Sequence, residues 1–188
     1  MMIHRRALLA MMVPVVLAST GCGYNQIQQL DEQAQSAKQN IQVQLQRRAD
    51  LIPNLVSTVK GYAKQEDTVF ISVANARARL NGAIQSGDPA QMAAADAQAT
   101  AGIGRLLAIA EAYPELKSNQ NFMQLQDELT GTENRIATAR TDYNQAAQQY
   151  NTYIRTFPQA ITAKVTGAKA RTYYEAPAES QTAPKVQF

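Results

Sequence analysis

Few side chains in this sequence are of the types that carry out chemistry. Its only histidine is His4 and its only cysteine is Cys22. These two residues cannot supply a Ser-His or Cys-His triad, a di-iron bundle motif or a zinc cluster. Carboxylates such as Asp127 and Glu133 remain available for acid–base work. Because charges on helical faces are usually only solvated, the sequence predicts a protein that is not an enzyme and holds no cofactor or metal.

The amino terminus is typical of a secretory signal peptide. A basic start is followed by an apolar run over residues 7–18 and by small residues up to Cys22. This stretch is shorter than the ~20 residues that span a bilayer. Gly21-Cys22 resembles a bacterial lipobox, which predicts that residues 1–21 are removed and that Cys22 carries acyl chains. An uncleaved signal anchor with a buried thiol is the alternative.

The predicted mature chain has Gly23 rather than Asp at its second position, which resembles the sorting rule for outer-membrane lipoproteins. We therefore expect a lipid-anchored, extracytoplasmic protein. It would lie on the periplasmic side of the outer membrane if the organism has two membranes, and at the cell membrane otherwise. Removal of Arg5 and Arg6 leaves 16 basic against 15 acidic side chains, a net charge of +1. Such a balance gives no basic footprint for nucleic acid.

Apolar residues recur every three or four positions over long stretches, as in helices that bury one face. This spacing predicts helices at residues 27–63, 67–86, 89–112 and 122–157. The stripe of the last helix comprises Phe122, Leu125, Leu129, Thr132, Ile136, Ala139, Tyr143, Ala146, Tyr150, Ile154 and Phe157.

Boundary signals separate these helices. Gly87 is a helix end, Asp88 a cap and Pro89 a first helical residue. Residues 113–118 are expected to form a loop, and Pro158 ends the last helix. The loops are short, which favours an up-and-down antiparallel four-helix bundle with long first and fourth helices over an extended coiled coil.

Charged residues gather beside a proline in the first helix. Arg47, Arg48 and Asp50 precede Pro53, which removes a helix hydrogen bond and predicts a kink but no stop, since the apolar stripe continues. The cluster is a candidate surface for an acidic partner. The alternative is that its charges pair across helix turns.

Three tyrosines lie on or near the stripe of the last helix. Tyr143, Tyr150 and Tyr153 could form an aromatic ligand slot. Aromatic residues on such a stripe belong far more often to the core.

Several motifs, in order, resemble the LemA family over residues from about 41 to the end. They are QRRADLIPNLV at 46–56, VKGYA at 59–63, ARA at 76–78, AEAYPELK at 110–117, NF at 121–122, GTENRI at 131–136, DYN at 142–144, YNTYIRTFP at 150–158 and PKV at 184–186. The resemblance implies a membrane-anchored bacterial protein with a helical bundle outside the cytoplasm, and no particular reaction. Family members usually have a spanning helix where this chain has a lipobox. Residues 161–169 are more polar than is usual in the family, which argues against insertion into the membrane.

Four segments follow from these observations: a signal peptide at 1–21, a lipid-anchored tether at 22–26, the bundle at 27–158 and a partly irregular strap at 159–188. We expect a non-catalytic scaffold or adaptor that is held at the membrane by its lipid and binds another envelope protein. A carboxylate-based enzyme or ligand-binding bundle and a membrane-remodelling protein are the alternatives.

Overall fold

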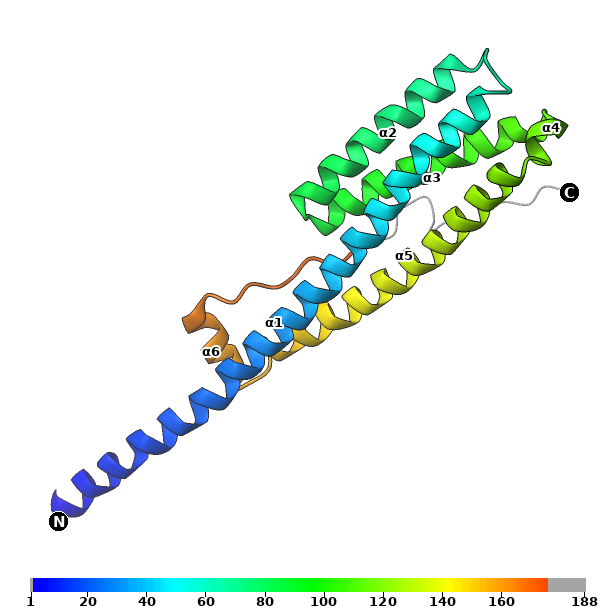
Figure 1. Ribbon diagram of the computed structural model, residues 1–188. Helices are drawn as coiled ribbons and strands as arrows, with labels where there is room; N and C mark the ends of the chain where they lie inside the picture. The colour runs from blue at the N-terminus through cyan, green and yellow to red at the C-terminus, as the bar shows by residue number, and fades with distance from the viewer. Residues whose placement is uncertain (1, 176–188) are drawn as a thin grey trace, which may run out of the picture. The chain divides into compact units, whose positions relative to one another are not determined.

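The protein is all-helical in a computed structural model that describes the backbone of residues 2–175 and the side chains of residues 23–175 (Figure 1). The helices are α1 (Met2–Lys60), α2 (Asp67–Ser86), α3 (Pro89–Glu111), α4 (Pro114–Lys117), α5 (Gln120–Tyr153) and α6 (Gln159–Thr166). The expected all-helical fold is confirmed. The predicted signal peptide and the side chain of Cys22 lie outside the described side chains, and residues 176–188 lie outside the described backbone.

The contacts divide the chain into two compact units. The larger unit contains residues 38–143 and 173–175, and the smaller contains residues 2–37 and 144–172. The helices α1 and α5 each contribute a segment to both units.

In the larger unit, hydrogen bonds between side chains of neighbouring helices show the relative direction of the helices. Arg47 bonds Glu128 and Gln44 bonds Arg135, so α1 and α5 are antiparallel there. Between α2 and α3, Arg79 bonds Gln98, and these two helices form a hairpin joined at Gly87. The core between the helices is apolar and rich in alanine; it includes Ile41, Leu45, Ala49, Ile52, Leu80, Met92, Ala99, Leu106 and Ile136.

The helix boundaries at the hairpin and at the start of α5 follow their capping signals. Asp88 accepts a hydrogen bond from the backbone N–H of Ala90 at 2.9 Å, and Gly87 has the left-handed conformation (φ 66°) that favours glycine at a helix end. Asn119 accepts a hydrogen bond from the N–H of Phe122 at 3.1 Å. These polar groups satisfy N–H groups that have no partner within the first turn.

Several details differ from the periodicity-based expectation. Residues 114–117, expected within a loop, form the short helix α4. The helix α5 ends at Tyr153 rather than 157, so the phase of its stripe is lost and Phe157 is 79% exposed instead of buried. Ala147 is buried on α5 in place of the expected Ala146.

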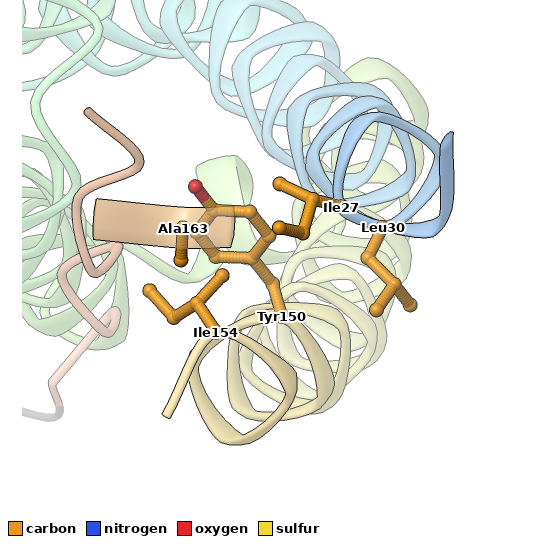
Figure 2. Close-up of a cluster of buried hydrophobic side chains, with 5 residues drawn as sticks. All are labelled: Ile27, Leu30, Tyr150, Ile154 and Ala163. Atoms are coloured by element: carbon orange, nitrogen blue, oxygen red, sulfur yellow. The ribbon is translucent and has the colours of Figure 1, made fainter. Parts of the chain in front are cut away.

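The smaller unit has its own apolar cluster of Ile27 and Leu30 from α1, Tyr150 from α5, Ile154 just after α5, and Ala163 from α6 (Figure 2). Residues 22–26, the expected lipid-anchored tether, are part of α1. They contain no helix breaker other than glycine, and Gly23 is buried.

The segment after α6 is held against this unit by polar contacts. The backbone N–H and C=O of Arg171 bond the side chain of buried Asn151 at 2.7 and 2.9 Å, and Arg171 Nε donates to Asp31 Oδ1 at 2.9 Å. An irregular segment is thereby fixed without regular secondary structure.

Candidate functional site

Four charged side chains from three helices meet inside the larger unit. Arg48 of α1 and Asp96 of α3 are 3% and 0% exposed, and Arg48 Nη1 lies 2.5 Å from Asp96 Oδ1. Arg140 of α5 donates to the second oxygen of Asp96, and Arg48 also donates to Glu133 of α5. Two guanidinium groups therefore face two carboxylates, and the charges of the cluster balance.

This arrangement determines what Asp96 can do. Both of its oxygens accept hydrogen bonds from arginine, so neither is left to take a proton from a substrate. A carboxylate with such partners joins helices and is poorly placed for acid–base catalysis.

Tyr174 covers the Arg140 side of the cluster. Its ring centroid lies 5.0 Å from the Arg140 guanidinium carbon, within the range of a cation–π interaction. Burial, and next the charge of Asp96, raise the pKa of the Tyr174 phenol, although the charge of Arg140 opposes this. The phenol therefore stays neutral at physiological pH.

The carboxylates considered for acid–base work have separate environments. Glu133 is bonded to Arg48, and Asp127 is exposed on the outer face of α5. Within the described part of the chain, no three side chains of the His, Cys, Asp and Glu types gather as a metal site would require.

The predicted cluster at Arg47, Arg48 and Asp50 divides between the surface and the interior. Arg47 and Asp50 are exposed, whereas Arg48 points into the core. Pairing within the helix is limited to Gln46, which donates to Asp50 at 2.9 Å. Arg47 instead pairs with Glu128 of α5 at 3.3 Å.

The exposed members line a shallow hollow between α1 and α5. Its volume is about 490 Å³, and its lining residues are Val43, Gln46, Arg47, Asp50, Leu51, Asn54 and Glu128. It combines an exposed valine with charges of both signs, and this composition is compatible with contact to the surface of another protein.

Pro53 leaves a carbonyl group without its helical partner, and α2 provides a replacement. Proline has no N–H to donate to the carbonyl of Ala49, four residues earlier. Arg77 Nε donates to this oxygen at 2.9 Å. The helix α1 continues through Pro53 as expected, and an unsatisfied carbonyl group is avoided.

The tyrosines of α5 belong to the core. Tyr143 and Tyr150 are buried, and Tyr153 packs against the apolar cluster of the smaller unit. Burial raises the pKa of Tyr150; the negative charge of Asp31 adds to this effect and the positive charge of Arg171 opposes it.

The sequence contained a signal for Asp96 that periodicity analysis missed. Asp96 occupies the buried stripe of α3, at helical spacing from Met92, Ala99 and Ile103. A carboxylate on an apolar stripe implies a buried cationic partner. That partner, Arg48, belongs to a motif from which a surface role had been inferred.

A model of the LemA family matches residues 37–188. The chain belongs to the LemA family. Two proteins of Paramagnetospirillum magneticum (strain AMB-1), named magnetosome proteins MamQ 1 and MamQ 2, are each 30% identical to it over 175 residues. Magnetosome protein MamQ of Magnetospirillum gryphiswaldense (strain MSR-1) is 29% identical over 174 residues.

These alignments cover 80–81% of this LemA-family chain and 64% of each relative. The chain therefore matches somewhat less than two thirds of the length of these magnetosome proteins. Within the described residues, none of the helices has both the length and the apolar character needed to cross a bilayer.

Proposed function

We propose that this LemA-family protein is a non-catalytic, membrane-anchored scaffold that binds another envelope protein through the hollow lined by Arg47, Asp50 and Val43. Its four longer helices would form an up-and-down antiparallel bundle. Lipidation at Cys22 would hold that bundle on the extracytoplasmic face of a membrane, which is the outer membrane in a cell with two membranes.

The observation that carries the proposal is the contrast between the interior and the surface of the larger unit. Interior charges are paired with one another, as Asp96 is with Arg48 and Arg140. By contrast, the hollow exposes Arg47, Glu128 and Val43 to solvent. Surface charges of this kind favour recognition of a partner over chemistry.

Membrane association is favoured by membership of the LemA family and by relatives named as magnetosome proteins. The sequence before Gly23, with its apolar run and Gly21-Cys22, favours a lipid at Cys22.

Photo-crosslinking from the hollow tests the scaffold role. A photoreactive amino acid replaces Val43 in the full chain in its native host, and a matched variant carries it at Ile71, since both side chains are 61% exposed. We expect one discrete crosslinked protein from position 43 that is lost on adding Arg47→Glu and Asp50→Lys. Identical products from positions 43 and 71 would contradict a specific surface.

Intact mass tests the anchor. Membrane-extracted protein is expected to lack residues 1–21 and to carry acyl mass, and a Cys22→Ala variant is expected to carry none. A full-length, unmodified wild-type chain would show that the anchor is not a lipid.

A further inference from the structure

The short helix α6 has its larger apolar side chains on the outside. Ala163 is its buried residue, whereas Ile161 and Val165 are 58% and 82% exposed, and Phe157 just before the helix is 79% exposed. These three side chains are spaced four residues apart. Single exposed apolar residues are ordinary, but three of them on and just before one short helix together expose a large apolar area to water.

The stretch of sequence that carries this face has a positive charge. From residue 143 to 174 the sequence has four basic residues (Arg155, Lys164, Lys169 and Arg171) and no acidic one. Arg171 is engaged by Asp31, while Arg155, Lys164 and Lys169 are exposed. Apolar side chains bordered by lysine and arginine are typical of helices that lie in the interface of an anionic bilayer.

The position of α6 in the smaller unit adds a second argument. It packs against α1 at Gly23, where an added methyl group would lie 3.7 Å from Gln159 Cγ and from Thr162 Oγ1. Gly23 directly follows Cys22 in the sequence. An eight-residue helix is about 12 Å long, so the whole of α6 lies close to the proposed point of lipid attachment.

We propose that α6, with Phe157, Ile161 and Val165, is a second membrane contact, which inserts into the headgroup region of an anionic phospholipid bilayer beside the anchor. This inference rests on the proposed anchoring at Cys22. The polar composition of residues 161–169 had argued against insertion, but composition does not tell which side chains face outward. In α6 the apolar side chains of Ile161 and Val165 face outward.

The test uses the absence of tryptophan from the chain. A Phe157→Trp variant carries a single fluorescent reporter on the proposed face, and a Val43→Trp variant carries one at an exposed position of the larger unit. Both full chains are extracted from membranes and reconstituted into phosphatidylethanolamine–phosphatidylglycerol vesicles that contain a brominated phospholipid. We expect the emission of Phe157→Trp to be blue-shifted. The brominated lipid should quench it at least roughly threefold more than it quenches Val43→Trp.

A second variant tests the face itself. Adding Ile161→Asp and Val165→Asp to Phe157→Trp should abolish the excess quenching. Ile71→Asp, which alters a side chain as exposed as Ile161, should leave it unchanged. Circular dichroism of each variant verifies that the helices are intact.

Flotation of the vesicles separates the two proposals. A chain that floats with the vesicles but shows no quenching of Phe157→Trp overturns the contact of α6 and leaves the anchor in place. Equal quenching of both reporters overturns the assignment to α6, because the bundle would then lie on the bilayer as a whole. A chain that does not float overturns both proposals.

Discussion

Arg47 and Arg48 are adjacent in the sequence and have opposite environments in the structure. A turn of 100° per residue places Arg47 at the surface beside Glu128 and Arg48 in the core beside Asp96. The same residue type therefore has two roles: Arg47 forms an exposed ion pair with Glu128, and Arg48 joins three helices.

This pair allows a matched test of the buried cluster. Arg48→Met is expected to lower the free energy of unfolding by about 3–5 kcal/mol, because Asp96 is left buried with one cationic partner instead of two. Arg47→Met removes an exposed ion pair and should cost about 1 kcal/mol or less. Urea denaturation of both variants measures the difference, and equal losses would contradict a special role for Arg48.

The buried tyrosines predict a loss of stability in alkali. The pKa of Tyr150 and of Tyr174 is raised in the folded state above the ordinary value of 10.0. Below pH 10 both states keep the phenolic protons; above it the unfolded state loses them first, so the free energy of unfolding falls as pH rises. Near-ultraviolet titration of tyrosinate should show a late-titrating fraction that shrinks in Tyr150→Phe and in Tyr174→Phe. If both variants retain that fraction, it belongs to other tyrosines.

At the scale of elements, a hydrogen bond joins α2 to α1 next to Pro53, where α1 lacks one of its backbone hydrogen bonds. Arg77 donates to the Ala49 carbonyl oxygen that Pro53 leaves without a partner. The proline in α1 and the arginine in α2 are therefore structurally coupled. Their sequence motifs lie more than twenty residues apart, and no local pattern reveals that they meet.

A double-mutant cycle tests this coupling. Arg77→Met alone should lower the free energy of unfolding by about 1–3 kcal/mol, because the Ala49 carbonyl loses its donor. In a Pro53→Ala background the backbone N–H returns, so the same substitution should have a clearly smaller effect. Equal effects in both backgrounds would indicate that Arg77 acts through other contacts.

The hairpin of α2 and α3 depends on close approach at one glycine. A methyl group at Gly102 would lie 3.3 Å from Val73 Cγ2, and β-branched Val73 is buried and has little rotamer freedom. Gly104, two residues on, has open space at the same position.

Alanine at these two positions should therefore change stability in opposite directions. Gly104→Ala is expected to raise the free energy of unfolding by up to about 1 kcal/mol through helix propensity. Gly102→Ala should lower it by about 1 kcal/mol, as overpacking exceeds that gain. Thermal unfolding of both variants measures the shifts, and similar gains would show that Val73 moves aside.

For the whole molecule, local spacing predicted the four longer helices because each of them carries its own apolar stripe, and the capping residues Asp88 and Asn119 mark where two of them begin. It failed where the outcome depends on another segment. Phe157 continues the spacing of α5 but lies beyond its end, and Asp96 fits its stripe only because Arg48 and Arg140 reach it. The hollow was foreseen only in part, since Glu128 comes from a distant part of the sequence.

The cluster of Arg48, Asp96, Glu133 and Arg140 also affects the register in which the helices pack. Four of the buried residues of α3 are alanines (Ala93, Ala95, Ala99 and Ala110), so a shift by one turn, about 5.4 Å, exchanges several small contacts for similar ones. The same shift of α3 would leave the buried carboxylate of Asp96 without its two arginine partners, and buried Arg48 with Glu133 alone.

We therefore hypothesise that the cluster selects one alignment of α1, α3 and α5 among several of comparable packing. A variant with Arg48→Met, Asp96→Leu, Glu133→Gln and Arg140→Met should keep its helical circular dichroism but give several sets of amide resonances. A single well-dispersed set would contradict the hypothesis. By this reasoning the cluster's main contribution is the uniqueness of the fold, and with it a hollow of constant shape for a partner to recognise.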